Sequence, residues 1–262
     1  MSYNYWESFV KDWSKKKVSS VWTNPDCLPL YNNPTKKDLT SLYIPEPWWG
    51  NDGTKPLHSV VINFNPGEGG PCQERGVIPY KTSYANDIVN NINVLCKTRE
   101  WHKNRRAMPV LNTLKNLECI TGSFGLENHL SIELLPWHTA NAQDKAYTQY
   151  QQMNINMVFE KVICFAANES RRIANKKLKN VVIMRMNGGR AKSVFEEMRK
   201  RIPNFQYKSQ TLHVTPCGNG KYMEFQIHSH GLNDIRFICI WGPRSRNNFP
   251  PKSALEDILR LI

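Results

Sequence analysis

The stretch HSVVINFNPGEGGP, residues 58–71, contains the pattern that decides the fold. Its first seven residues are mostly apolar and rich in β-branched side chains, which is typical of a short buried β-strand. Asn65-Pro66-Gly67 and further glycines follow at once, and these residue types favour turns. A buried strand that feeds a glycine-rich loop is a common position for a ligand site in an α/β fold.

Strand and helix patterns alternate along the rest of the chain. Further strands are predicted over residues 129–135, 181–186 and 235–240, the last being the most apolar of two or three strand-like runs in 211–241. Helical spacing predicts helices over residues 83–96, 109–121, 153–178 and 188–201, and a short one from residue 252. We therefore predict a three-layer α/β/α domain with a mainly parallel central sheet.

The first 55 residues differ from the rest in composition. Residues 3–17 have apolar and aromatic side chains at helical spacing, and residues 18–54 are rich in proline, asparagine and aromatics. We predict an N-terminal helix and an extended arm packed on the core over residues 1–55, followed by the α/β domain over 56–262. Trp48 and Trp49 would anchor this arm or cap a pocket, and we favour the anchor.

The charge balance points to a polyanionic partner. The chain has 35 Lys and Arg against 22 Asp and Glu, a formal net charge of +13. Because neutralised phosphates release condensed counterions, DNA is the expected partner, and a basic but otherwise ordinary enzyme is the alternative.

Cysteine usage and hydropathy narrow the class further. The seven cysteines are scattered singly, without the Cys/His spacing of zinc or iron–sulfur sites. No apolar run approaches the roughly 20 residues of a membrane span, and the N-terminus lacks the pattern of a signal peptide. We expect a cytoplasmic monomer with reduced thiols, no metal, no cofactor and no membrane contact.

Three loops that follow predicted strands are the candidate site. They are Asn65-Pro66-Gly67, Pro136-Trp137-His138-Thr139 and residues 243–248. In a parallel sheet such loops converge at the carboxyl edge of the strands, so residues far apart in sequence line one pocket.

These segments resemble a known family. Residues 60–67 (VVINFNPG) with 76–80 (GVIPY) are similar to the first motif of the mismatch-specific and single-strand-selective branches of the uracil-DNA glycosylase superfamily. Residues 243–247 (PRSRN) resemble the His-Pro-Ser-Pro-Arg-Asn loop of that superfamily. The resemblance covers most of residues 58–262 and implies a cofactor-free enzyme that hydrolyses the N-glycosidic bond of a flipped base and leaves an abasic site.

The first motif supplies most of the roles that the resemblance implies. Asn65 would position the attacking water, and Pro66 and Gly67 would let the backbone approach the nucleotide. Glu68 would act as a base or stabilise the sugar cation, and Tyr80 would stack on the base. The alternatives are an asparagine that satisfies a turn, a solvated glutamate and a core tyrosine.

The other two motifs depart from the family. Trp137 and His138 stand where the family presents an asparagine to the base, and His138 would bind the base, stabilise its anion or be structural. The family histidine of the third motif is missing, so His228 or His230 would replace it from a neighbouring strand, unless the pair lies in a surface hairpin.

Several basic segments are candidate DNA contacts. Two arginine pairs and the residues beside them are assigned to phosphate binding, with solvated surface side chains as the alternative: Arg171, Arg172, Arg244, Ser245, Arg246 and Asn247. Residues 103–106 and 176–177 are further phosphate contacts if all of them lie on one face.

Three functions remain open. The first is a glycosylase for a large or unusual base, such as glucosylated hydroxymethylcytosine in phage DNA, which would serve phage defence. The second is a catalytically silent DNA-binding module on the same fold. The third, ranked last, is a metal-dependent nuclease, for which Glu68, Glu133 and Asp234 are the only carboxylates near strand ends.

Overall fold

The computed structural model describes the strands of one sheet and the helices that pack on it. The described residues are 5, 48–51, 53–64, 118, 121–122, 128–135, 151–152, 154–210, 213–214, 221–241, 253, 256–257 and 260. The helix predicted over 83–96 lies outside the described residues. So do the helix predicted over 3–17 apart from Tyr5, most of the helix predicted over 109–121, and most of the arm.

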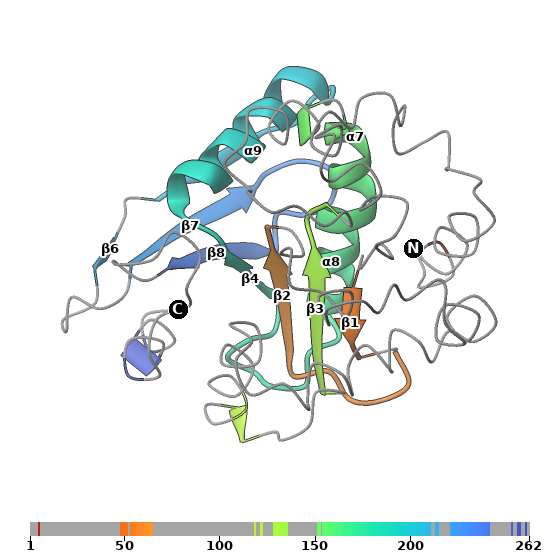
Figure 1. Ribbon diagram of the computed structural model, residues 1–262, viewed down its shortest axis with the longest axis vertical. Helices are drawn as coiled ribbons and strands as arrows, with labels where there is room; N and C mark the ends of the chain where they lie inside the picture. The colour runs from red at the N-terminus through yellow and green to blue at the C-terminus, as the bar shows by residue number, and fades with distance from the viewer. Residues whose placement is uncertain are drawn as a thin grey trace, which may run out of the picture.

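One mixed sheet organises the described residues (Figure 1). Its strands are β1 (Trp48–Gly50), β2 (Ser59–Asn63), β3 (His129–Glu133), β4 (Val181–Arg185), β5 (Tyr207–Ser209), β6 (His213–Val214), β7 (Lys221–Ile227) and β8 (Arg236–Trp241). The spatial order is β1-β3-β2-β4-β8-β7-β5, and β6 also pairs with β7. The protein is therefore of the α/β class, as the alternating patterns predicted.

The centre of the sheet is parallel and its two margins are antiparallel. Strands β3, β2, β4 and β8 all run in one direction. Strand β1 runs against β3, and β7 runs against β8 on one side and against β5 and β6 on the other. Strand β1 comes from the end of the predicted arm, and Trp48 is only 1% exposed, which fits the interpretation of this residue as an anchor.

The helix predicted over residues 153–178 is shorter than expected. Helical structure runs through α7 (Ile155–Met157), the π-helical segment η6 (Val158–Ile163) and α8 (Cys164–Ser170), and residues 171–180 then form turns. Ile173 and Leu178 continue the apolar spacing, but they are buried in the turns instead of on a helix. Asn180 has a φ of 62°, a left-handed conformation that asparagine tolerates better than most residues.

Helix α9 (Gly188–Arg201) has the predicted bounds. It begins where the Asn187 side chain accepts a hydrogen bond from the backbone N–H of Arg190 at 2.9 Å, a typical N-cap. It ends in Arg199, Lys200 and Arg201, whose positive charges favour a helix C-terminus.

The described helices cover one face of the sheet. Helix α8 packs on β2 and β4, α9 packs on β8, and α7 contacts α9, so the three helices lie together on one side of the sheet (Figure 1). The ring of Phe195 on α9 stacks on Phe225 at 4.6 Å and meets Phe237 edge-on at 5.8 Å. Residues that could form the second helical layer of the prediction lie outside the described part of the chain.

Two further observations concern membrane-spanning helices and cysteine thiols. In the part of the chain that the structure describes, no helix has the length and apolarity needed to cross a membrane. Cys164 and Cys239 are both free thiols, and burial raises the pKa of each above its usual value.

Candidate functional site

The four parallel strands end at one edge of the sheet, which we call the carboxyl edge. Asn63, Glu133, Arg185 and Trp241 are the last residues of β2, β3, β4 and β8. From β2 the chain moves to β3 on one side, and it later returns to β4 on the other side. Ligands of α/β sheets bind outside the strand ends at such a reversal, which here lies between β2 and β4.

The three segments singled out in the sequence follow strands that end at this edge. Asn65 comes two residues after β2, Trp137 four residues after β3, and residue 243 two residues after β8. The common direction of the three strands therefore agrees with the predicted convergence. Eleven predicted site residues themselves lie outside the described residues: Asn65, Pro66, Gly67, Glu68, Tyr80, Trp137, His138, Arg244, Ser245, Arg246 and Asn247.

A buried polar network lies at the carboxyl edge on the face away from α8 and α9. The side-chain amide of Asn63 donates to Ser131 Oγ at 2.6 Å and to Glu133 Oε1 at 3.0 Å. Strand register places Asn63 between Glu133 on β3 and Arg185 on β4. Asn63 and Glu133 are 2% and 3% exposed, so this network is shielded from bulk water.

Arg185 completes this network with a positive charge. Its side chain is only partly exposed, and desolvation lowers the pKa of the guanidinium to about 10, while the negative charge of Glu133 opposes that shift. The guanidinium is therefore still protonated at neutral pH. Its Nε atom and Asn63 Oδ1 are buried without a hydrogen-bond partner among the described residues. A donor and an acceptor on neighbouring strands are thus available to a polar group at this edge.

Aromatic and basic side chains lie on the helix-covered side of the same edge. The guanidinium of Arg190, in the first turn of α9, lies 4.5 Å from the ring centre of Phe64, the residue that follows β2. Trp241 packs against Gly188 at the start of α9, and Lys221 is its neighbour on β7. With Arg185, these residues make the edge positively charged, which suits a phosphate-rich ligand.

His228 and His230 lie at the other edge of the sheet. They belong to the loop of residues 228–235 that joins β7 to β8, and because β7 runs against β8, this loop lies where β8 begins. Both residues are exposed, and the His230 ring packs edge-on against Phe159 with 5.0 Å between centres. The hypothesis that either histidine reaches the base site is therefore corrected, and the alternative of a surface hairpin fits the structure.

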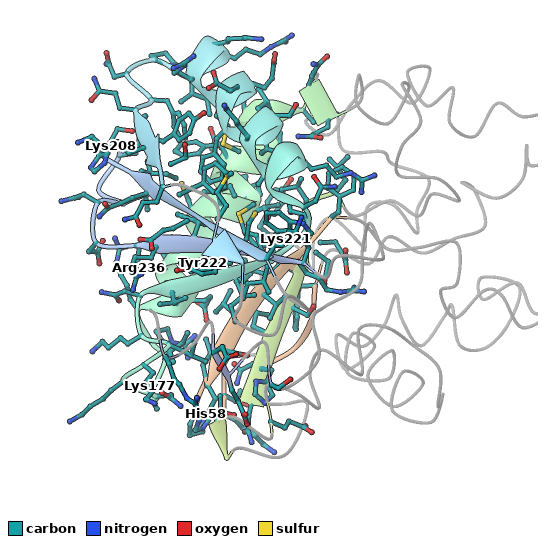
Figure 2. The ribbon with its side chains drawn as sticks, turned by 90° about the vertical axis from the view of Figure 1, so that its left-hand side faces the viewer. His58, Lys177, Lys208, Lys221, Tyr222 and Arg236 are labelled. Carbon is teal, nitrogen blue, oxygen red and sulfur yellow. The ribbon has the colours of Figure 1, made fainter. Side chains whose placement is uncertain are left out.

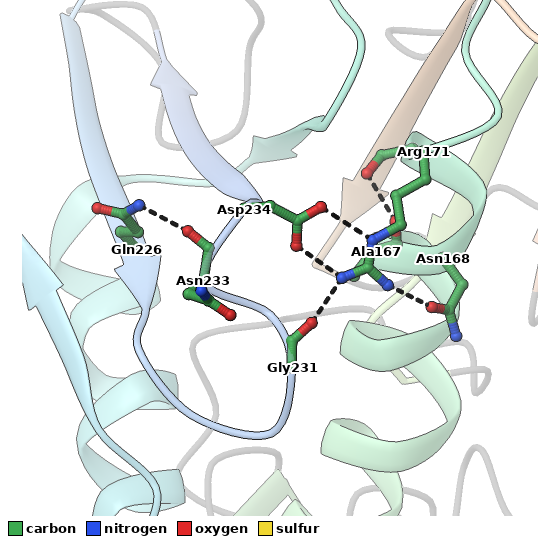
Figure 3. Close-up of polar contacts among 8 residues, drawn as sticks. Ala167, Asn168, Arg171, Gln226, Gly231, Asn233 and Asp234 are labelled. Atoms are coloured by element: carbon green, nitrogen blue, oxygen red, sulfur yellow. Dashed lines mark hydrogen bonds and ion pairs between the residues drawn. The ribbon is translucent and has the colours of Figure 1, made fainter.

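Arg171 also lies at this opposite edge, where it holds the β7–β8 loop to α8 (Figure 3). Its Nε and Nη2 donate to the Asp234 carboxylate at 3.0 and 2.7 Å, Nη2 also to Gly231 O at 2.6 Å, and Nη1 to Asn168 Oδ1 at 2.8 Å. These hydrogen bonds hold the pKa of Asp234 below its usual value.

Arg172 also forms hydrogen bonds within the fold. Its Nη1 donates to Glu169 Oε2 at 2.5 Å, and its Nη2 donates to Gly53 O at 3.0 Å. We therefore correct the assignment of Arg171 and Arg172 to phosphate binding, because their guanidinium groups connect structural segments.

Of the three carboxylates proposed for a nuclease, Glu133 and Asp234 lie apart, and Glu68 is outside the described residues. Glu133 ends β3 at the carboxyl edge, whereas Asp234 precedes β8 at the opposite edge and is paired with Arg171. Among the described residues, no group of three or more His, Cys, Asp or Glu side chains is arranged to hold a metal ion.

Sequence reasoning missed Asn63 and Arg185. The signal that would have found Asn63 is the alternation within the strands. Ser59 and Asn63 on β2 and His129, Ser131 and Glu133 on β3 are polar at every second or fourth position, so they share one face. Ser59 Oγ and His129 Nδ1 are hydrogen-bonded at 2.7 Å across the two strands.

Comparisons with protein-family models, with curated proteins and with solved structures give no match for this chain.

Proposed function

We propose that the protein is a DNA glycosylase of the uracil-DNA glycosylase type, which hydrolyses the N-glycosidic bond of a flipped base. The observation that carries the proposal is the common edge: the strands that precede all three motif segments are parallel and end together. The resemblance of residues 60–67 and 243–247 to family motifs supplies the reaction, and the net charge of +13 supports DNA as the substrate.

In the proposed reaction, water adds to C1′ of the deoxyribose as the bond to the base nitrogen breaks. The base leaves with the bonding electrons and is then protonated, so the products are a free base and an abasic site. Because the sugar develops oxocarbenium character, the water needs positioning more than activation. Asn65 takes this role, and Glu68 stabilises the positive sugar. Tyr80 stacks on the base, and His138 stabilises the departing base.

The charges at the carboxyl edge support this chemistry. The leaving base carries negative charge in the transition state, and fixed positive groups stabilise such charge best where water is excluded. Arg185 and Arg190 bring guanidinium groups to this edge from β4 and α9. They offer a source of positive charge in a chain that lacks the family histidine in its third motif.

We further propose a modified cytosine as the substrate, with glucosylated hydroxymethylcytosine of phage DNA as the first candidate. A carboxylate accepts hydrogen bonds and donates none, so it pairs with the exocyclic amino group of cytosine and not with the O4 atom of uracil. Glu133, at the end of β3, is the described carboxylate at the carboxyl edge. The absence of the family's uracil-contacting asparagine in residues 136–139 points the same way.

The test is base release measured by mass spectrometry, in EDTA, from unmodified DNA, uracil-containing DNA and DNA with glucosylated hydroxymethylcytosine. Asn65→Ala is compared with Asn233→Ala, a matched change at an exposed asparagine of the β7–β8 loop. We expect release of the modified cytosine, loss of release in Asn65→Ala and normal release in Asn233→Ala. Tight DNA binding with no base released from any substrate would instead support the silent binding module.

A further inference from the structure

The edge opposite the proposed site, where β2, β4 and β8 begin, carries a lysine-rich surface built from two adjoining turns. One turn, residues 171–180, joins α8 to β4, and the other, residues 53–56, precedes β2. Leu57 and Ile173 form a β-bridge between them, and the Ala174 N–H donates to Leu57 O at 2.9 Å. Two segments far apart in sequence thus form one continuous surface.

The longer turn is held in place at both ends. Arg171 ties its start to the β7–β8 loop, and Arg172 ties it to Gly53 O in the neighbouring turn. At its end, the Asn180 N–H donates to Ser170 O at 3.1 Å, and Asn175 Oδ1 accepts from the Lys177 N–H at 3.0 Å within the turn. The backbone of the turn is therefore held at several points along its length.

Four of the exposed side chains on these two turns are lysines. Lys176, Lys177 and Lys179 are exposed, and Lys55 is exposed on the neighbouring turn. Figure 2 shows Lys177 and His58 at the same end of the strands, with Lys221 toward the other end. We call Lys55, Lys176, Lys177 and Lys179 the lysine platform.

Two described carboxylates near the longer turn are paired with arginines. Asp234 binds Arg171 and Glu169 binds Arg172, and neither forms an ion pair with Lys176, Lys177 or Lys179. The three lysines of the longer turn form no salt bridge with the described residues. The last turn of α9 is different, because its three basic side chains pair with glutamates one turn earlier on the same helix. The longer turn therefore keeps an uncompensated positive charge where another basic cluster of the protein is compensated.

We propose that the lysine platform binds the phosphate backbone of nucleic acid, at a second contact surface distinct from the carboxyl edge. A lysine ammonium acts as a point charge without the fork geometry of arginine, so it fits sequence-independent contact with phosphates. Strands of five residues separate the two edges by about 16 Å, so the platform contacts a different stretch of backbone from the one at the proposed active site. This contact does not depend on the glycosylase reaction.

The test is binding of unmodified duplex and single-stranded DNA, followed by fluorescence anisotropy over a series of salt concentrations. The platform variant is Lys176→Gln/Lys177→Gln/Lys179→Gln. The matched control is Lys192→Gln/Lys200→Gln/Lys208→Gln, which removes three exposed lysines from α9 and β5 and so the same net charge. A third variant replaces the same three lysines, Lys176, Lys177 and Lys179, by arginine. Circular dichroism verifies that each variant is folded.

We expect the plot of log Kobs against log salt to become less steep in the platform variant, with the magnitude of its negative slope reduced by about 2 to 3. Each lost duplex phosphate contact reduces that magnitude by about 0.9. The control should change the slope by less than about 1, and the arginine variant should keep the wild-type slope. Equal losses in the platform variant and the control would overturn the proposal, because net charge alone would then explain binding. An unchanged slope in the platform variant would also overturn it.

Two further outcomes distinguish a nucleic-acid contact from a membrane contact and from the proposed base-release site. Vesicles of anionic lipid should not bind the protein; binding that is lost only in the platform variant, with DNA affinity intact, would make the platform a membrane contact and refute the proposal. Because unmodified DNA is the probe, the platform result stands whether or not any base is released. Failure of the glycosylase proposal is therefore distinguishable from failure of this one.

Discussion

Substitution of Gly188 by alanine tests the packing that joins α9 to the carboxyl edge. A Cβ atom added at Gly188 would lie 2.7 Å from Trp241 Cη2 and 3.2 Å from Cζ3, and 3.4 Å from Met223 Cε. The first distance is shorter than real Cβ contacts, so the indole ring must move. Trp241 is the last residue of β8 and packs against the hydrophobic core, and overpacking at such a place typically costs about 1–3 kcal/mol.

The neighbouring glycine provides a matched control with the opposite expectation. A Cβ atom at Gly189 meets only Asn187 Oδ1, at 3.4 Å, and the residue is exposed. Neither glycine has a positive φ, so alanine fits both backbones. Gly189→Ala should therefore stabilise the protein by about 0.4–1 kcal/mol, because it restricts the unfolded chain without a clash.

Urea unfolding of the two single variants, followed by circular dichroism and tryptophan fluorescence, measures both effects. We expect a lower midpoint for Gly188→Ala, a higher one for Gly189→Ala and an altered tryptophan signal in Gly188→Ala alone. Base release should also fall in Gly188→Ala if the displaced Trp241 moves the segment that follows β8. Equal midpoints for the two variants would refute the close packing of Gly188 on Trp241.

Four further predictions concern individual side chains. A double-mutant cycle of Arg171→Ala and Asp234→Ala should give a coupling of only about 0.5–1 kcal/mol, because both side chains are partly exposed. Since the pKa of Asp234 is lowered by folding, its contribution is present above the unfolded value near 3.8 and is lost as pH falls through the folded value; the melting temperatures of wild type and Asp234→Asn should therefore converge in acid. Asn187→Ala should lower unfolding free energy by about 1 kcal/mol in urea titrations, whereas Asn187→Ser should retain most of it. Alkylation by iodoacetamide near neutral pH should leave Cys164 and Cys239 unmodified until the protein is unfolded, as peptide mass spectrometry would show, because burial raises both pKa values.

The elements that were predicted well are those whose ends carry local chemical signals. The strand predicted over residues 58–64 is followed in the sequence by asparagine, proline and glycine, and α9 begins after Asn187 and ends in three cationic residues. The helix of residues 153–178 has no such stop signal at Ser170. Ile173 and Leu178 prolong its apolar spacing, and only tertiary contacts show that they are buried in turns.

The direction of strand β7 could not be predicted from the sequence. Residues 221–227 have a strand pattern, but that pattern is the same for a parallel and an antiparallel strand. Because β7 is antiparallel to β8, the loop with His228 and His230 lies away from the carboxyl edge. The same topology determines that Asp234 and Glu133 lie at opposite ends of the sheet.

Charge counting also fails to separate cations that are paired within the fold from those that are not, because arginine and lysine are used differently here. Arg171 and Arg172 lie beside the lysine platform and are as cationic as its members, but their planar groups each bind a carboxylate and a backbone carbonyl and so fix the turns. The three lysines of the longer turn keep their charge uncompensated. The positive charge that this edge presents therefore depends on the structural arginines, and Arg171→Ala should weaken DNA binding in the anisotropy assay because it loosens the longer turn.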